Sequence, residues 1–199
     1  MAPYIGGDMA AYARLRHLAV FAAAVGVAAC APSDAPERVV EARPSLRPAP
    51  RGAALLKVTM LSAHDTARRA VGVAPLAWDD MLAADALGYA RVMARTGKFA
   101  HADQPHGAMR QGENLWTGTR DAYAYGEMIG HWAAEARDFI NLATPAFSRT
   151  GKATDVGHYT QMVWRGSTRV GCATASNARD DYLVCRYAPA GNVMGVRAF

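Results

Sequence analysis

Two short segments of the sequence each place one ionisable side chain among aromatic residues and glycines. One is GENLW, from Gly112 to Trp116, and the other is GHYTQMVWRGS, from Gly157 to Ser167. A carboxylate such as Glu113 and an imidazole such as His158 are able to transfer protons or to ligate a divalent metal ion when folding brings them together. The two segments therefore predict a shared polar site.

No other catalytic motif accompanies these segments. The sequence lacks HExxH, P-loop and dinucleotide-binding patterns, and neither Ser148 nor Ser167 stands in a nucleophile elbow. Any enzymatic activity would therefore depend on the histidines and carboxylates of the predicted site.

Helical patterns occupy the first part of the chain, and strand patterns follow them. Three segments have apolar residues at helical spacing. They are residues 55–70, a segment that begins at Asp79 or Asp80 and ends near Thr96, and residues 121–139. Residues 98–111 are rich in turn-forming residues, so they predict a loop that leads to Glu113. Early helices and late strands together predict an α+β fold.

Two of the three cysteines lie in the predicted strands. If RVGCATAS and DYLVCRY form an antiparallel hairpin around residues 177–180, Ser176 faces Asp181, and the same register places Cys172 opposite Cys185. Cysteines that lie directly opposite each other are close enough to form a disulfide. In an exported protein a Cys172–Cys185 disulfide is favoured, and two free buried thiols are the alternative.

The N-terminal part of the sequence resembles an export signal. Residues 18–29 are apolar, follow two arginines and are too short to span a bilayer as a stable helix. The segment VAAC, which ends at Cys30, resembles the bacterial lipobox, in which the cysteine is lipidated and attaches the protein to the membrane. An ordinary cleavable signal is the alternative, and either Met1 or Met9 is the start.

Three regions are predicted from these patterns. Residues 1–30 form a signal peptide of the lipoprotein type, residues 31–53 a disordered tether rich in Pro, Ala and Arg, and residues 54–199 a single domain. The formal net charge is +5, and no cluster of Lys and Arg alternates with aromatic residues. The composition therefore predicts no nucleic-acid partner, although it allows a loose attraction to an anionic envelope.

Several segments resemble the CAP superfamily, also called SCP domains, which contains cysteine-rich secretory proteins, antigen 5 proteins and pathogenesis-related 1 proteins. Besides GENLW and GHYTQMVW, the matching segments are HDTARRAVGVAPLAWDDMLAADALGYA, from His64 to Ala90, and YLVCRYAPAGNV, from Tyr182 to Val193. They follow one another in the order that the family has. The resemblance covers nearly the whole chain after Leu55, and it implies a three-layer α-β-α sandwich.

CAP domains characteristically hold two histidines and two acidic residues in a central cleft. The resemblance places these four residues at His101, Glu113, Glu135 and His158. His106 is a rival for the position of His101, because the local motif is short. Tyr159 and Gln161 have polar ends beside His158 and are predicted at the rim of the cleft.

The four residues are compatible with two kinds of site. His101 and His158 would ligate zinc or a similar divalent ion, while the carboxylates orient the rings or activate a water molecule. Alternatively, the histidines and glutamates satisfy one another's hydrogen bonds without any metal. A catalytic zinc usually has three protein ligands, so two histidines predict a weaker site and no required cofactor beyond a zinc ion bound in some conditions.

Other ionisable and aromatic residues are predicted to be structural. His131 lies one helical turn from both Glu127 and Glu135, a spacing typical of exposed pairs, although rotation of the helix would turn Glu135 inward. His64, Asp65 and Arg68 are predicted to make a buried structural contact. Three tryptophans are predicted in the core: Trp116, Trp132 and Trp164.

The resemblance implies a bacterial exported protein that is not an enzyme. It would be anchored to the envelope through lipidated Cys30 or be secreted, and its cleft would bind a small apolar or amphiphilic ligand, such as a lipid, or a surface partner. The alternative is a zinc-dependent hydrolase or protease in which His101 and His158 hold the ion and Glu113 or Glu135 acts as general base. The sequence leaves the ligand and the oligomeric state open.

Overall fold

A computed structural model of the chain describes residues 47–107 and 109–199. The predicted signal peptide, Cys30 and most of the predicted tether lie outside the described residues. Within the described ranges, no helix combines the length and the apolar character that crossing a membrane requires.

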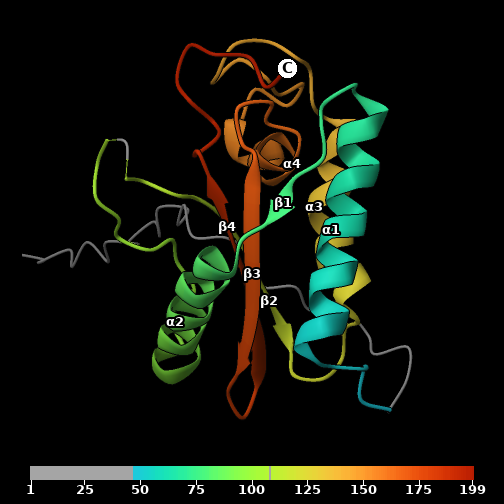
Figure 1. The fold of residues 1–199 in the computed structure, drawn as a ribbon, viewed down its shortest axis with the longest axis vertical. Helices are drawn as coiled ribbons and strands as arrows, with labels where there is room; N and C mark the ends of the chain where they lie inside the picture. The colour runs from blue at the N-terminus through green and yellow to red at the C-terminus, as the bar shows by residue number, and fades with distance from the viewer. Residues whose placement is uncertain (1–46, 108) are drawn as a thin grey trace, which may run out of the picture. The chain divides into compact units, whose positions relative to one another are not determined.

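The described chain folds into three layers, with a sheet between helices (Figure 1). Helix α2 (Asp80–Thr96) packs against one face, and helices α1 (Ala53–Ala70) and α3 (Tyr125–Ala134) cover the other. Shorter helical segments follow α3: 3-10 helices η1 (Glu135–Arg137) and η2 (Ala153–Val156), and helix α4 (Gly157–Met162). The predicted α+β fold with an α-β-α sandwich is confirmed.

The sheet has four strands in the order β1-β3-β4-β2. The strands are β1 (Ala77–Trp78), β2 (Gly112–Thr119), β3 (Arg169–Ser176) and β4 (Asp180–Ala188). The short strand β1 runs parallel to β3, whereas β4 is antiparallel to both β3 and β2. Strand β2 forms one edge of the sheet, and β1 with the remainder of β3 forms the opposite edge.

The predicted cysteine hairpin is confirmed with its register. Strands β3 and β4 pair Ser176 with Asp181 and Cys172 with Cys185. The two cysteines are joined by a disulfide, and their Cα atoms are 4.1 Å apart. The turn over residues 177–180 therefore sets the hairpin register, and the disulfide links the two strands in that register.

Helix α2 begins and ends as its sequence predicts. The carboxylate of Asp79 accepts hydrogen bonds from the backbone N–H groups of Met81 and Leu82, at 2.9 and 3.1 Å, and so caps the helix. Gly97 ends the helix in the left-handed conformation, with φ of 69°. Met81, an apolar residue in the first turn of the helix, is 74% exposed.

Two elements near the predicted site are absent from the sequence prediction. Strand β2 contains GENLW, and α4 consists of GHYTQM. The residues of β2 are buried without a two-residue alternation, because α2 covers one face of the strand and α3 and α4 the other. The helix expected over residues 121–139 is shorter, since its regular part runs from Tyr125 to Ala134.

Candidate functional site

The first histidine–glutamate pair lies on the side of β2 that faces α2. Nδ1 of His101, in the loop after α2, is 2.7 Å from Oε1 of Glu113, and the same oxygen accepts a hydrogen bond of 3.0 Å from the backbone N–H of Ala102. The other oxygen, Oε2, is 2.8 Å from Nη2 of Arg186, which lies opposite Glu113 on β4. The negative charge of the buried Glu113 carboxylate is therefore balanced by Arg186. The His101 ring covers this carboxylate, and 55% of the His101 side chain is exposed.

The second pair joins the end of α3 to the start of α4. Nδ1 of His158 is 2.6 Å from Oε1 of Glu135, and Oε2 of Glu135 accepts a hydrogen bond of 2.9 Å from the backbone N–H of Tyr159. The His158 ring stacks on Trp132, with a centroid distance of 5.7 Å and an interplanar angle of 15°. Each glutamate thus holds its histidine through Nδ1. Within the described residues, neither His101 nor His158 has a hydrogen-bond partner at Nε2.

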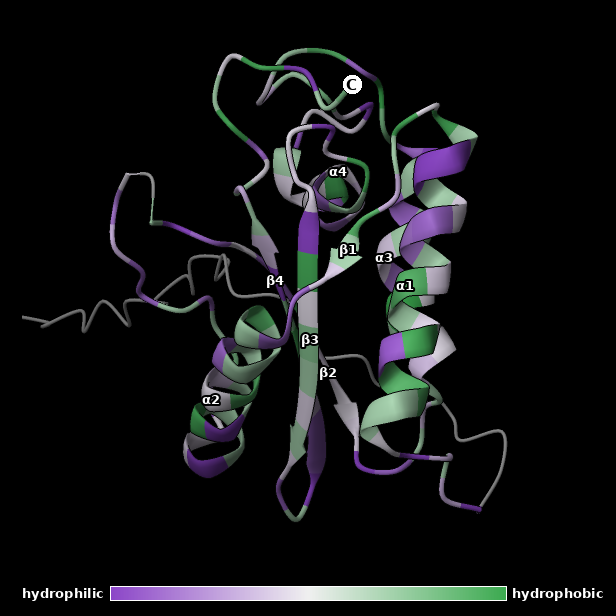
Figure 2. Cartoon of the chain, viewed as in Figure 1, coloured by the Kyte–Doolittle hydropathy of each residue, from purple (hydrophilic) through white to green (hydrophobic). Residues whose placement is uncertain are grey.

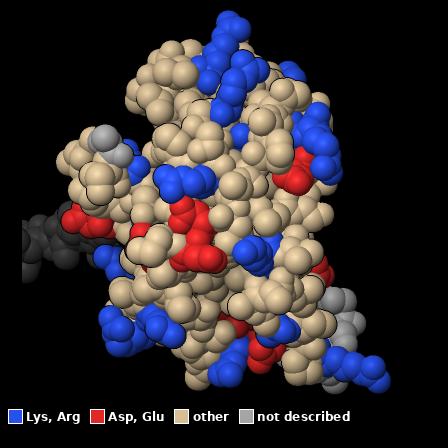
Figure 3. Space-filling model, viewed as in Figure 1, with Lys and Arg blue, Asp and Glu red and all other residues tan. Residues whose placement is uncertain are grey.

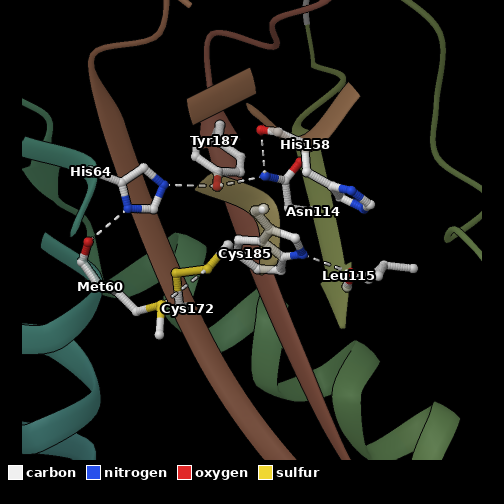
Figure 4. The surroundings of a disulfide bond; sticks show 9 residues. Met60, His64, Asn114, Leu115, His158, Cys172, Cys185 and Tyr187 are labelled. Atoms are coloured by element: carbon white, nitrogen blue, oxygen red, sulfur yellow. Dashed lines mark hydrogen bonds between the residues drawn. A yellow bond between two sulfur atoms is a disulfide. The ribbon is translucent and has the colours of Figure 1, made fainter. Parts of the chain in front are cut away.

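Asn114 connects the second pair to strand β2 (Figure 4). Its side-chain amide donates hydrogen bonds to the backbone oxygen of His158, at 3.0 Å, and to the hydroxyl of Tyr187, at 3.2 Å. Successive residues of a strand point to opposite faces, so Glu113 and Asn114 direct the two pairs to opposite sides of the same sheet edge. The four residues that the resemblance selects are therefore arranged as two pairs that flank β2.

A buried network continues from Tyr187 to α1. Nε2 of His64 is 2.9 Å from the Tyr187 hydroxyl, and Nδ1 is 2.7 Å from the backbone oxygen of Met60. Burial lowers the pKa of His64 to about 4, and burial also raises the pKa of Tyr187. Both groups are therefore neutral at pH 7. Through Asn114, their hydrogen bonds reach the backbone oxygen of His158 without a charge on His64 or Tyr187.

Arg68 holds the segment that follows α4. Its guanidinium is buried and donates hydrogen bonds to four backbone oxygens, at distances between 2.5 and 3.1 Å. These oxygens belong to Ala74, Met162, Trp164 and Ser167. The buried contact of α1 therefore consists of His64 on the sheet and Arg68 on this loop. Asp65 is not part of it, because 31% of its side chain is exposed and its carboxylate lies 3.8 Å from Nη1 of Arg69.

Three other residues of the sequence prediction take different places. Tyr159 is buried and packs edge-on against Phe139, with ring centroids 5.3 Å apart. Gln161 is only 2% exposed, and its amide bonds to the hydroxyl of Ser167 and to the backbone N–H of Gly191. Gln161 therefore supports the loop after α4 from inside. His106 is exposed, and it is His101 that contacts Glu113.

Neither of the two glutamates one helical turn from His131 forms the exposed pair with it that the spacing predicts. Glu127 turns back to accept a hydrogen bond of 2.6 Å from the backbone N–H of Ala124, and Glu135 turns inward to His158. The His131 ring lies edge-on to Trp116, at 6.3 Å between centroids. Trp116, Trp132 and Trp164 are all buried, as predicted.

The donor set does not fit a catalytic zinc site. Among the described residues, no group of three or more His, Cys, Asp and Glu side chains is placed to hold one metal ion. Both glutamates already accept hydrogen bonds from a histidine and a backbone N–H group. The arrangement offers one Nε2 atom in each pair, and two histidines make a weaker site than the three protein ligands of a catalytic zinc.

One hollow borders the second histidine–glutamate pair, and a larger one lies at the opposite edge of the sheet. A polar hollow of about 490 Å³ borders Glu135 and is lined by charged residues that include Glu127, Arg137 and Asp155. A larger cavity of about 730 Å³ lies between α1 and α2, at the edge formed by β1 and β3. Since β2 is the other edge of the sheet, this cavity and the histidine–glutamate pairs are separated by the width of the sheet.

Comparisons with known proteins agree with this architecture. The profile of the cysteine-rich secretory protein family, CAP, matches residues 61–187. The chain is 40% identical over 136 residues to pathogenesis-related protein 1C of Nicotiana tabacum, which covers 68% of this chain and 76% of that protein. It is 36% identical over 140 residues to a PR-1 type protein of Sambucus nigra, which covers 70% and 79% of the two chains.

Solved structures show the same fold. The crystal structure of NaASP2 with Zn²⁺ superimposes with a TM-score of 0.62 at 24% identity, and covers 76% of this chain and 89% of that chain. Venom allergen-like protein 4 of Schistosoma mansoni gives a TM-score of 0.54 at 20% identity, and covers 71% and 92%. Fold and paired site together define a CAP domain. The chain belongs to the cysteine-rich secretory protein family.

Proposed function

We propose that this protein is an exported CAP domain that binds a small amphiphilic molecule, without catalysing a reaction on it. The observation that carries the proposal is the cavity of about 730 Å³ between α1 and α2. Small-molecule sites usually have volumes of roughly 300 to 1,000 Å³ and mostly apolar walls. The location differs from the sequence prediction, which expected the ligand beside the histidines and glutamates.

The walls of the cavity suit the apolar part of such a ligand. Leu56 comes from α1, Ala84 and Leu87 from α2, Trp78 from β1 and Ala173 from β3. Small side chains on α2 leave room between the helix and the sheet edge. An acyl chain or a similar apolar group would bury its surface there with a gain of about 0.8 kcal/mol for each methylene.

The cavity lining has one cation placed for an acidic head group, since its two carboxylates, Asp80 and Asp121, contact Trp78 and Arg120. Lys57 lies at the mouth, with its Nζ atom 5.4 Å from the centre of the Trp78 ring. Within the described residues Lys57 forms no ion pair, whereas the neighbouring Arg51 is held by the carboxylate of Asp181 at 2.6 Å. We therefore expect a ligand with a carboxylate or phosphate near Lys57 and an apolar group between the helices.

Filling the cavity tests the proposal. Ala84→Phe places a phenyl ring among the lining residues, and Ala70→Phe makes the same change at an exposed position of α1 outside the cavity. Binding of a fluorescent fatty acid to residues 34–199 would be measured by titration. We expect the Ala84 variant to lose at least tenfold in affinity and the Ala70 variant to bind like the wild type. Equal binding by both variants, or none by the wild type, contradicts the proposal.

The histidine–glutamate pairs are a second candidate site, for a divalent ion. The observation in favour is that each glutamate orients a ring through Nδ1, which leaves Nε2 as the metal-binding atom. Zinc calorimetry on the same fragment, with His101→Ala and His158→Ala tested singly and together, measures this. Micromolar binding that one of the single variants weakens supports a metal ion at that pair. Unchanged binding in the double variant, or no binding, leaves the pairs as a hydrogen-bond network.

A hydrolase is the less favoured alternative. It needs a bound ion and in addition a glutamate that is released from its histidine to act as general base. Glu113→Gln and Glu135→Gln would then abolish zinc-dependent turnover in folded protein.

Export is proposed from the family and from the N-terminal segment together. The relatives belong to a family of secretory proteins. Attachment to a bacterial envelope through a lipidated Cys30 is tested by mass spectrometry of the membrane fraction. A diacylglyceryl-modified peptide that starts at Cys30 supports it, and a free N-terminus downstream of Cys30 overturns it.

A further inference from the structure

Two loops near the C-terminus form one exposed apolar surface. The backbone N–H of Thr144 donates to the oxygen of Val196 at 3.0 Å, and the N–H of Gly195 donates to the oxygen of Thr144 at 2.9 Å. Four apolar side chains project from the joined loops with exposed fractions of 43, 47, 70 and 47%: Leu142, Val193, Met194 and Val196. We call these four residues the apolar tip. Figure 2 shows hydrophobic stretches in the loops at this end.

The apolar tip rests on a buried base. Ala198 is 1% exposed and belongs to a cluster with Val163 and Trp164, and its oxygen accepts a hydrogen bond of 2.7 Å from the N–H of Arg165. The side chain of Asn192 donates to the oxygen of Gly157 at 2.9 Å. A single exposed apolar residue needs no explanation, whereas four on fixed, joined loops indicate a contact surface.

Cations outnumber carboxylates around the apolar tip. Four exposed cations lie on the same loops or beside them: Arg149, Lys152, Arg165 and Arg197. Residues 139–154 and 182–199 contain no Asp or Glu, and the carboxylate of the next residue, Asp155, accepts a hydrogen bond of 2.6 Å from the hydroxyl of Thr150. In the described part of the chain none of the four cations forms a salt bridge. The terminal residue Phe199 accepts a hydrogen bond from Asn141. Figure 3 shows Lys and Arg side chains at the upper end of the molecule, where the C-terminus lies.

We propose that the apolar tip and its cations bind the surface of an anionic lipid bilayer. Aliphatic side chains and a methionine would enter the boundary between head groups and acyl chains, while the arginines and the lysine contact anionic head groups. The surface lies at the end of the domain opposite the start of α1, where the described chain begins (Figure 1). It is therefore distinct from any attachment through the N-terminal segment, and it does not depend on the ligand proposed for the cavity.

Co-sedimentation with vesicles tests this surface. The protein is residues 34–199, which contain every element and every core cluster described here and which exclude the signal segment and Cys30. Vesicles are made of phosphatidylcholine alone or mixed with phosphatidylglycerol. We expect the wild type to bind the anionic vesicles and to dissociate as salt is raised, because screening weakens the attraction to the head groups.

Two matched pairs of variants separate the charge from the apolar contact. Arg165→Gln with Arg197→Gln should weaken binding to anionic vesicles about 25-fold, at about fivefold for each cation, and Arg91→Gln with Arg95→Gln on α2 is the control. Val193→Ser with Met194→Ser should weaken binding at least about tenfold, with Met81→Ser and Val92→Ser as the control.

Several results would overturn the proposal. These are equal binding to neutral and anionic vesicles, no binding by the wild type, and equal losses in the variants and their controls. Absence of binding with a self-associating wild type would show that the apolar tip contacts protein and not lipid. Circular dichroism of each variant verifies that the fold is retained.

Discussion

His64 and His158 lie in neighbouring networks that differ in their access to solvent. His64 is fully buried and has a partner at both ring nitrogens. His158 keeps 23% of its side chain exposed and has a partner at Nδ1 alone among the described residues. Asn114 touches both networks, through Tyr187 on one side and the backbone of His158 on the other. The comparison teaches that burial, and not residue type, separates a histidine that stabilises the fold from one that is able to bind.

The largest effect is expected on the buried side. Arg68→Met removes the donor from four buried backbone oxygens, so it should lower the free energy of unfolding by about 3 to 5 kcal/mol. Chemical denaturation measures the loss. Arg69→Met is the control, because the Arg69 side chain is 68% exposed and should change stability by no more than about 0.5 kcal/mol. Similar losses for both would show that the buried hydrogen bonds do not matter.

The protonation of His64 should give the next largest effect. Its folded pKa of about 4 lies below the unfolded value of 6.5, so the folded state binds the proton less well. Stability is therefore full above pH 6.5 and falls by about 3 kcal/mol as the pH drops to 4. Denaturation at several pH values checks this. His64→Gln should remove about 3 kcal/mol of this loss between pH 6.5 and pH 4, and an unchanged pH dependence would assign the loss to other groups.

Asn114→Ala tests the link between the two networks. It removes the donor to the backbone of His158 and to Tyr187, so it should cost about 1 to 3 kcal/mol. The His158 ring signals in an NMR spectrum should also shift, because the backbone that carries the ring loses a hydrogen bond. If stability falls but the signals stay in place, Asn114 supports the core and does not position His158.

The smallest effect is expected at His101. More than half of its side chain is exposed, and Glu113 keeps Arg186 and the N–H of Ala102 as partners without it. His101→Ala should therefore change the free energy of unfolding by no more than about 0.5 kcal/mol. A loss of more than about 2 kcal/mol in thermal or chemical denaturation would place His101 with the buried group and not with the open one.

The sequence predicts best what depends on neighbouring residues. The hairpin register and the Cys172–Cys185 disulfide follow from the position of the turn over residues 177–180, and the capping of α2 follows from the position of Asp79. These features need no knowledge of distant contacts. The family resemblance adds the sandwich, and the structure places His101 beside Glu113 and His158 beside Glu135.

Features that depend on distant contacts were beyond the sequence. Strand β2 pairs with β4 more than 60 residues later in the chain, so GENLW carries no local strand signal. Arg186 has no motif of its own and gains its role by facing Glu113 in the register of β2 and β4. The interior position of Gln161 depends on Ser167 and Gly191, and its polar end alone suggested a rim. The apolar cavity arises only when α1 and α2 are placed beside β3.

The shortness of β1 has a consequence for self-association. β1 pairs with only the first two residues of β3, and the N–H of Asp79 donates to the oxygen of Val170, which points away from β4. By the two-residue period, the backbone groups of Thr174 and Ser176 point the same way, into the cavity between α1 and α2. An open strand edge is a template for another strand. A molecule that occupies this cavity would also shield that edge, so the empty domain should aggregate more readily than the loaded one.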